Sequence, residues 1–277
     1  MVSNKKALCV GINNFKNLPD AALKGCVNDA NDMSALLKDL LGFADSDIVK
    51  LTDAQATKAN IMNNLKSMVA DAKAGKLSYL VFSLSSHGTQ VPDTSGDEPD
   101  RADEAFCPND LIQKGNQWDT DHIIIDDELH DLFVQLPEAV LLEVYMDTCH
   151  SGTGLKAIDL LLDRKPRYLP PPSLDAFEQV EGRRARGLHQ ALLEKGMTHH
   201  ILWAGCRADQ TSADANIGGT YHGAFTYYYC KHMRATGNKL SRSEVLKKVR
   251  ADLKKGRYTQ IPQLESEATV RKSPVKV

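Results

Sequence analysis

The stretch that decides the fold is residues 140–152, V-L-L-E-V-Y-M-D-T-C-H-S-G. Its apolar run, 140–146, stops abruptly at a polar turn that holds Asp147 and Cys149. A buried strand that ends in this way places its last residues in the crevice at the carboxyl edge of an open α/β sheet, where such sheets hold their ligands. The pattern therefore predicts a core strand with a candidate nucleophile, Cys149, at its tip.

Other apolar runs predict further strands at residues 6–12, 48–51, 77–84, 200–205 and 268–272. Between them, apolar residues at helical spacing predict helices at 27–41, 57–75, 128–136 and 223–233, and another that begins after residue 241. Thr57 is a candidate N-cap, and Ser241 with Glu244 forms a capping box. Strands that alternate with helices predict an α/β fold, with a mostly parallel sheet of about six or more strands and helices on both faces.

Two segments lack this periodicity. Residues 90–122 are polar and rich in Asp, Gly and Pro, which predicts a long loop. Residues 163–187 combine four prolines with several arginines, a composition that favours an exposed linker. We expect a single domain at 1–277, made of a large part at about 1–162, a linker at 163–198 and a small part at 199–277.

The composition is ordinary for a globular protein, with 42% apolar and 25% charged residues. A net charge of −2 is not typical of a nucleic-acid-binding protein. The basic cluster at 247–257 lies on a predicted helix, and we interpret it as a solvated helix face. Because no apolar run approaches ~18 residues, we expect no membrane span. The N-terminus has no signal-peptide pattern and the six cysteines are scattered, so reduced thiols and a cytoplasmic location are expected.

Two predicted strands end in residues suited to nucleophilic catalysis, His87 and Cys149. A nearby imidazole can take the thiol proton, an effect of about 10²–10⁴ in rate. The backbone N–H groups of Gly88 and Cys149 can form an oxyanion hole, with about 3–4 kcal/mol contributed by each donor. His150 directly follows the cysteine, so its side chain is expected to point away from the thiol. The structural alternative is that His87 caps a strand and Cys149 fills the core.

Four motifs carry a family resemblance: S-S-H-G-T-Q at 85–90, D-T-C-H-S-G-T at 147–153, G-I-N-N at 11–14 and A-L-K-G-C-V-N-D-A at 22–30. With them the chain resembles the caspase-like cysteine peptidases over residues 5–265, and within that clan the metacaspases and bacterial orthocaspases. The resemblance implies the caspase-like three-layer sandwich and a dyad of Cys149 and His87. It also implies cleavage of protein or peptide substrates after arginine or lysine. Ser86 stands where the family has glycine, and its small side chain is expected to do little harm.

The resemblance further implies a substrate pocket made by Cys26, Asp29, Ser85 and Asp147. Carboxylates beside the nucleophile would bind a guanidinium through charge-assisted hydrogen bonds and would repel a substrate aspartate. Asp29 has an alternative interpretation as a solvated residue in the first turn of its helix, where the helix dipole favours a carboxylate.

Calcium stimulation is also implied, with Asp103, Asp126 and Asp127 matching the family's ligands. The family's fourth aspartate corresponds to Lys156, whose ammonium removes a ligand and adds a like charge. The acidic stretch at 97–104 can supply a replacement oxygen. Asp126 and Asp127 have an alternative interpretation as N-cap and first-turn residues of the helix at 128–136.

Family members often cut themselves between their two parts, and Arg183, Arg184 and Arg186 suit an arginine-directed protease. The alternatives are Arg164, Lys165 and Arg167. The resemblance favours a monomer. Two rival functions are a catalytically silent scaffold, which would need neither His87 nor Cys149, and a nucleotide-binding protein. The second lacks both the G-x-G-x-x-G pattern and the P-loop lysine.

Overall fold

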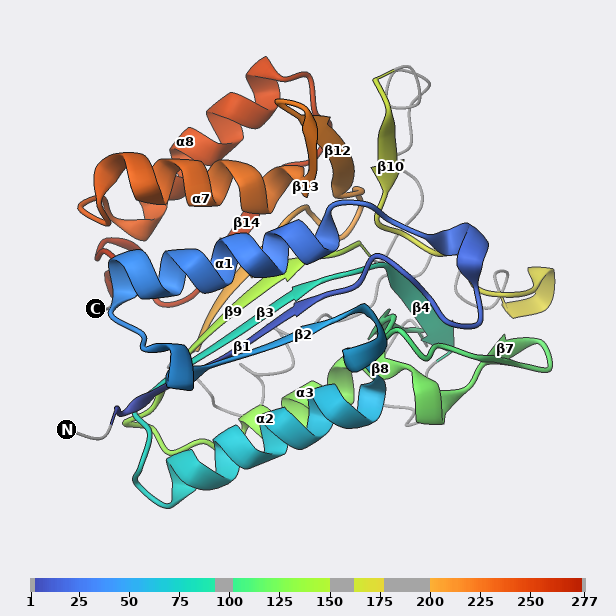
Figure 1. The fold of residues 1–277 in the computed structure, drawn as a ribbon, viewed down its shortest axis with the longest axis horizontal. Coiled ribbons are helices and arrows are strands. Elements are labelled where there is room, and N and C mark those ends of the chain that lie inside the picture. Colours follow the sequence, from blue (N-terminus) through green and yellow to red (C-terminus); the bar gives the residue numbers. More distant parts are fainter. Residues whose placement is uncertain (1–2, 93–101, 150–161, 177–199, 276–277) are drawn as a thin grey trace.

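The structure, a computed structural model, describes residues 3–92, 102–149, 162–176 and 200–275. Its centre is a six-stranded sheet in the order β14-β11-β9-β3-β1-β2 (Figure 1). All neighbours pair in parallel except β14, which pairs antiparallel with β11. The strands are β1 Lys5–Gly11, β2 Ile48–Thr52, β3 Tyr79–Ser85, β9 Leu141–Asp147, β11 His200–Ala204 and β14 Gln263–Glu265.

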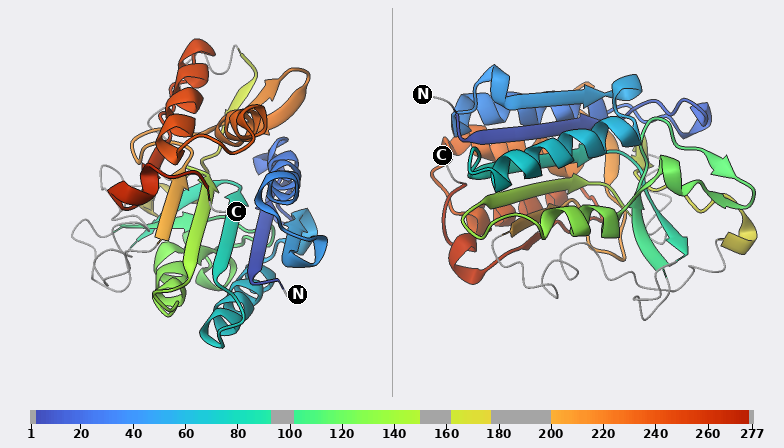
Figure 2. Two further views of the ribbon diagram at one scale, coloured as in Figure 1. Left: turned by 90° about the vertical axis from the view of Figure 1, so that its left-hand side faces the viewer. Right: turned by 90° about the horizontal axis from the view of Figure 1, so that it is seen from below.

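Helices cover both faces of this sheet, as the alternation of strands and helices predicts (Figures 1 and 2). One face carries α1 Cys26–Leu41, α7 Ala224–Thr236 and α8 Arg242–Lys255, and the other carries α2 Lys58–Lys73 and α3 Asp126–Phe133. Side chains alternate along β1, so that Ala7 and Cys9 join the core on the α1 side while Leu8 and Val10 join the core on the α2 side. The short helices are η1 Pro19–Ala21, η2 Asp45–Asp47, η3 Asp53–Gln55, η4 Thr120–His122 and α9 Ala268–Arg271.

The predicted helix starts are confirmed at two helices. Thr57 Oγ1 accepts a hydrogen bond from the Asn60 amide at 3.2 Å, and Ser241 with Glu244 forms the capping box of α8. At α3 the N-cap is Ile125, so Asp126 and Asp127 are first-turn residues and the N-cap interpretation is wrong.

A buried ion pair fastens α8 to the sheet. Glu143 on β9 is fully buried and accepts two hydrogen bonds from the Arg242 guanidinium, at 3.0 and 2.9 Å. Tyr79 and Trp203, on the strands to either side, donate to the same carboxylate at 3.1 and 2.9 Å. The Glu143 charge is therefore fully hydrogen-bonded, which a charge without water requires.

Three sequence predictions differ from the structure. The predicted loop at 90–122 contains strands, because β4 Gly88–Pro92, β5 Ala102–Phe106 and β8 Ile124–Ile125 form one small sheet and β6 Gln113–Lys114 pairs with β7 Gln117–Trp118. The last strand lies at Gln263–Glu265, and the region predicted as a strand at 268–272 is mostly the helix α9.

The third difference concerns the predicted linker. Its first residues form β10 Arg164–Pro166, which pairs antiparallel with β12 Ala213–Ile217, itself paired with β13 Thr220–Gly223. Arg167, which follows β10, is completely buried. The exposed-linker prediction is thus wrong here, because long-range strand pairing orders a segment whose local composition suggests a loop.

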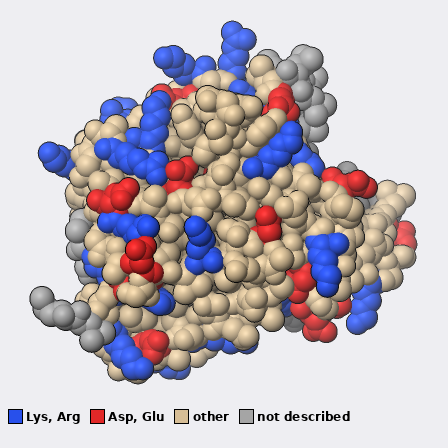
Figure 3. Space-filling model, viewed as in Figure 1, with Lys and Arg blue, Asp and Glu red and all other residues tan. Residues whose placement is uncertain are grey.

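The exposed basic residues and the unpaired cysteines are those that the sequence predicts. The basic side chains of residues 247, 248, 250, 254, 255 and 257 are exposed, and positive charge gathers on the α8 side of the molecule (Figure 3). All six cysteines are buried free thiols. Across the described residues, every helix is too short or too polar to cross a membrane.

Candidate active site

The register of two neighbouring strands brings the candidate dyad together. β3 and β9 pair in parallel, with Ser85 opposite Asp147 at their carboxyl ends. His87 and Cys149 each stand two residues beyond these paired ends, so they leave the same edge of the sheet side by side. The arrangement follows from two apolar runs that stop at equivalent positions.

His87 is held as a neutral base. Its Nε2 lies 2.7 Å from the carbonyl oxygen of Ala21, and because a carbonyl only accepts, Nε2 carries the proton. Nδ1 is then the basic nitrogen, and it has no hydrogen-bond partner among the described residues. Burial lowers the pKa of His87 to about 4, so the ring is uncharged at neutral pH. The Phe15 ring, 5.3 Å away between centroids, packs against it.

Cys149 is almost completely buried, and two donors face its sulfur. One is the backbone N–H of Ser212, in the loop before β12. The other is the Cys206 thiol, whose sulfur lies 3.8 Å from that of Cys149. The hydrogen bond to Cys149 and burial both raise the pKa of Cys206, so Cys206 remains a thiol donor. Two hydrogen bonds directed at one sulfur suit a group that carries negative charge during reaction.

A backbone carbonyl from the chain itself lies between the two strand ends. The carbonyl oxygen of Arg167 accepts from the Gly88 amide at 2.9 Å and from the Cys149 amide at 3.3 Å. These are the two N–H groups predicted to form the oxyanion hole. The Arg167 amide donates to the Ser212 carbonyl at 3.0 Å, and the Leu169 amide donates to the Gly88 carbonyl at 2.9 Å. Backbone hydrogen bonds thus hold the Arg167 carbonyl beside the candidate nucleophile.

The Arg167 side chain fills a pocket of three carboxylates. Its Nη2 lies 2.7 Å from Asp29 and 3.0 Å from Asp214, and its Nη1 lies 3.4 Å from Asp147. The exposed fraction is 0% for Arg167 and at most 2% for each carboxylate, so water does not screen these pairs. The pocket is therefore built for a planar cation.

Backbone and hydroxyl donors hold the carboxylates in place. Asp29 accepts from the Gly223 amide at 2.9 Å, and Asp147 accepts from the amide and hydroxyl of Thr226 at 3.0 and 2.7 Å. Asp214 accepts from two amides just before α1, at 2.8 and 2.9 Å. Burial raises the pKa of Asp29 to about 7, and the Arg167 charge opposes that rise.

The structure brings most of the predicted site residues to this place. Cys149, His87, Gly88, Asp29 and Asp147 all contact or adjoin Arg167 or the residues that hold it. The remaining two predicted pocket residues are near: Cys26 begins α1, fully buried, and Ser85 lies opposite Asp147 in the sheet register. Burial raises the pKa of the Cys26 thiol, and the charge of Arg167 partly offsets the rise.

The structure describes the three predicted calcium ligands but not all of the residues expected around them. Asp103 on β5 and Asp126 on α3 are buried, and Asp127 is half-buried. Within the described ranges, no three His, Cys, Asp or Glu side chains form a group that could hold a metal. Most of the acidic stretch at 97–104, and Lys156, lie outside those ranges. The three carboxylates alone do not complete a site, and calcium binding stays a prediction.

Arg167 was predicted from the sequence only as an alternative self-cleavage residue. The other site residues that the sequence did not single out are Asp214, Gly223, Ser212, Cys206 and Thr226. Asp214 lies in a short polar strand without periodic signal, and Gly223 was expected only as a helix start. For Arg167 a signal existed, since R-K-P-R at 164–167 is a basic tetrapeptide in a chain predicted to cut after basic residues. That signal made Arg167 an alternative self-cleavage residue, but the exposed-linker interpretation did not predict that its side chain is buried.

The chain is similar in sequence to known proteins over most of its length. Residues 5–158 match the family model described as Metacaspase, peptidase C14 domain. Metacaspase-1 of Emericella nidulans is 33% identical over 295 residues, covering 95% of this chain and 70% of that protein. Metacaspase-1A of Aspergillus niger is 32% identical, covering 94% of this chain and 69% of that protein.

Two solved structures share the fold. Protein GSU0716 from Geobacter sulfurreducens superimposes with a TM-score of 0.66 at 25% identity, covering 98% of this chain and 97% of that one. Caspase-1 from Spodoptera frugiperda gives a TM-score of 0.58 at 12% identity, covering 96% and 87%. The caspase-like α/β sandwich expected from the sequence is thereby confirmed.

Proposed function

The chain belongs to the metacaspase family of cysteine peptidases, and on that premise we propose that it is an endopeptidase that cuts protein substrates after arginine or lysine. Cys149 is the nucleophile and His87 the general base. Asp29, Asp147 and Asp214 select the basic side chain. The same site processes the chain itself, and calcium stimulates it.

The observation that carries the proposal is the position of residues 164–169. β10 adds an antiparallel strand to β12, a common way for a peptide to bind at a sheet edge. The next residue, Arg167, has its carbonyl on the Gly88 and Cys149 amides and its guanidinium among three carboxylates. A segment held in this way occupies the position of a substrate whose scissile bond is Arg167–Tyr168.

The proposed chemistry uses only groups at this site. His87 Nδ1 takes the thiol proton as the sulfur of Cys149 attacks the carbonyl carbon. The resulting oxyanion is held by the amides of Gly88 and Cys149. Collapse breaks the C–N bond, and His87 gives its proton to the leaving amine. Water, deprotonated by His87, then hydrolyses the thioester, which releases the new carboxylate and restores the free sulfur.

Self-processing is proposed at the Arg167–Tyr168 bond. Arg183, Arg184 and Arg186 lie outside the described residues and stay as predictions. Of the alternatives, Arg164 and Lys165 have their side chains directed away from the carboxylate pocket, onto backbone carbonyls. The contacts of Arg167 therefore support it as the residue before the cut.

A peptide panel tests the specificity. Fluorogenic tetrapeptides that differ only in the residue before the reporter (Arg, Lys, citrulline or Asp) are incubated with wild-type protein and with Cys149→Ala. We expect turnover of Arg and Lys peptides by the wild type alone. No turnover of either would refute the proposal and favour a scaffold, while cleavage after Asp would refute the pocket assignment.

Intact mass and N-terminal sequencing test self-processing. The expected new fragment begins at Tyr168 in wild-type protein, and is absent from Cys149→Ala and from Arg167→Gln. Arg184→Gln serves as the matched control and is expected to process normally. A fragment that begins at Ala185 or Gly187 would instead show that the chain is cut after Arg184 or Arg186, which would contradict cleavage after Arg167.

Calcium stimulation, a cytoplasmic location and a monomeric state are the remaining parts of the proposal. Carboxylate oxygens are the ligands that Ca²⁺ prefers. Asp103 is buried on β5, which pairs with β8, and Asp126 is buried at the start of α3, directly after β8. Calcium is expected to raise both the melting temperature and the turnover of Arg peptides. Asp126→Asn is expected to abolish both responses. A melting temperature that calcium leaves unchanged would remove this part of the proposal.

A further inference from the structure

We propose that the active site has a second cation-selective subsite, formed by the Tyr258 ring and the carbonyls of Gly256 and Arg257, which recognises an arginine three residues before the one preceding the cut. The inference rests on the proposed function, because it treats residues 164–167 as a bound substrate. It adds a specificity determinant on α8 and the turn after it. Substrates are then peptides of the form Arg-x-x-Arg.

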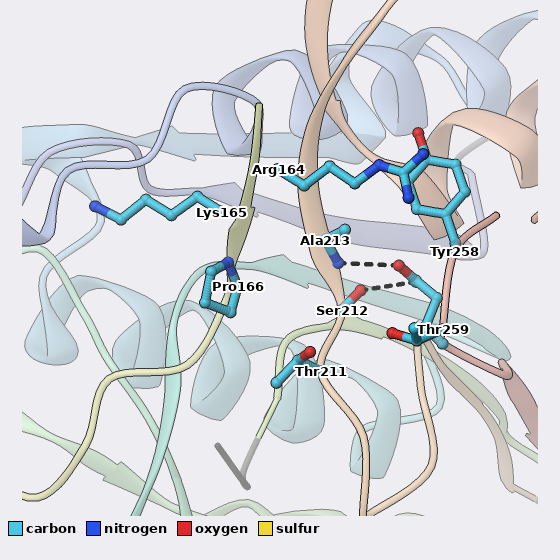
Figure 4. Close-up of a pocket in the computed structure, with 9 residues that line it drawn as sticks. Arg164, Lys165, Pro166, Thr211, Ser212, Ala213, Tyr258 and Thr259 are labelled. Atoms are coloured by element: carbon cyan, nitrogen blue, oxygen red, sulfur yellow. Dashed lines mark hydrogen bonds between the residues drawn. The ribbon is translucent and has the colours of Figure 1, made fainter. Parts of the chain in front are cut away.

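The contacts of Arg164 support this subsite. Its guanidinium carbon lies 3.7 Å from the centre of the Tyr258 ring, which is cation–π stacking distance. Its Nη1 donates to the Arg257 carbonyl at 2.9 Å and its Nη2 donates to the Gly256 carbonyl at 2.6 Å. Figure 4 shows the Arg164 side chain extended toward Tyr258 while Lys165 points the opposite way. Arg164 is 9% exposed, so the guanidinium is mostly removed from water.

The turn after α8 provides the groups that form the subsite. The Gly256 and Arg257 carbonyls follow the C-terminus of α8, where the helix dipole is negative and attracts a cation. Arg257 has a φ of +58°, a left-handed conformation that ends the helix there. The Tyr258 ring is supported edge-on by Tyr228, with centroids 6.2 Å apart.

The geometry also predicts which cation is preferred. Two carbonyls and one ring face accept a planar group with several N–H donors, which arginine has and lysine lacks. The exposed side chains of Lys254 and Lys255 on the last turn of α8 repel any approaching cation. Selectivity for arginine at this subsite therefore depends on short-range contacts with the guanidinium, because the long-range field of the nearby lysines is unfavourable for any cation.

Lys165 and Pro166 occupy the two positions between these arginines. Lys165 Nζ donates to the Ala22 carbonyl at 2.7 Å, on the far side of the strand from Tyr258. Pro166 lines the groove beside Ser212 and Thr211. Because the Lys165 side chain points away from Tyr258, a peptide altered at that position provides an internal control.

Two fluorogenic peptides, Arg-Lys-Pro-Arg and Ala-Lys-Pro-Arg, test the proposal on wild-type, Tyr258→Ala and Tyr258→Phe proteins. The wild type is expected to prefer the first peptide about tenfold in kcat/KM, mainly through KM. Tyr258→Ala is expected to reduce that preference about two- to fivefold, the lower end of what a cation–π contact contributes. Tyr258→Phe, which keeps an aromatic face, is expected to retain most of it. A third peptide, Arg-Ala-Pro-Arg, gives the preference for Lys over Ala at the second position, which is the control that no variant should change.

Equal kcat/KM for the two peptides in the wild type would overturn the subsite, and so would a preference that Tyr258→Ala leaves intact. Failure of the wild type to cut either peptide would refute the proposed function itself, since the Ala peptide needs only the main pocket. Arg164→Met, which keeps the side-chain length and removes the charge, is an independent test if Tyr258→Ala does not fold. It is expected to slow self-cleavage about tenfold, and an unchanged rate would contradict the proposal.

Discussion

Replacing Asp29 with asparagine removes one charge from the main pocket and keeps its shape. Asp29 is fully buried and lies 2.7 Å from the Arg167 guanidinium. A hydrogen bond to a charged group contributes about 1.5–3 kcal/mol, and about 1.4 kcal/mol is a factor of ten in rate. Asp29→Asn should therefore lower kcat/KM for arginine peptides by about ten- to 150-fold.

The assay compares arginine with citrulline, its uncharged isostere, in the same peptide. In wild-type protein the three carboxylates should favour arginine strongly, and in Asp29→Asn that ratio should fall by the same ten- to 150-fold. Asp32→Asn is a matched control, because Asp32 lies on α1 one turn later and pairs instead with Arg234 at 3.1 Å and with His222 at 3.2 Å. Asp32→Asn should change the ratio of arginine to citrulline turnover by no more than about twofold, because the loss of a surface charge usually has a small effect.

Two results would refute the reasoning. If Asp29→Asn kept the wild-type ratio while its melting temperature was unchanged, the Asp29 carboxylate would not select the cation. If both variants lowered the ratio equally, the effect would come from the charge of α1 as a whole rather than from the contact with Arg167.

Three further predictions follow from other contacts. Gly223→Ala should abolish self-cleavage, seen as a single intact mass, because the added methyl would overlap the Arg167 guanidinium. Glu143→Gln should lower the free energy of unfolding in urea by about 3–5 kcal/mol, because it leaves Arg242 buried without its counter-charge. Turnover of arginine peptides should fall as pH drops below about 7, since burial raises the pKa of Asp29 to about 7 and the protonated acid attracts the substrate cation less. A turnover profile that is flat from pH 8 to pH 6 would contradict this last prediction.

Much of the fold could be predicted because its signals are local. Each core strand is an apolar run that ends at a polar turn, and each long helix repeats apolar residues at a spacing of three to four. The ends of β3 and β9 could even be placed together, because parallel neighbours share a carboxyl edge. That shared edge is why the positions of His87 and Cys149 at neighbouring strand ends could be predicted from the sequence.

The rest could not be predicted, because the pairings that form it join distant segments. β10 is three residues long, contains Pro166 and pairs with a strand about fifty residues later. Nothing in the composition of 164–167 distinguishes an ordered strand from a loop. Asp214 is held in the pocket by strand pairing and by amides far away in the chain, contacts that no periodic pattern records.

In the proposed mechanism, substrate selection and bond breaking depend on the same strand end. Asp147 closes β9 and holds the guanidinium, while Cys149, two residues later, faces the carbonyl of the same arginine. Under this proposal, a cation bound among the three carboxylates places the scissile carbonyl on the two amides, and a side chain that fits poorly displaces that carbonyl. Positioning of this kind affects the transition state more than ground-state binding. Pocket substitutions should thus lower kcat as well as raise KM, which a remote binding pocket would not do.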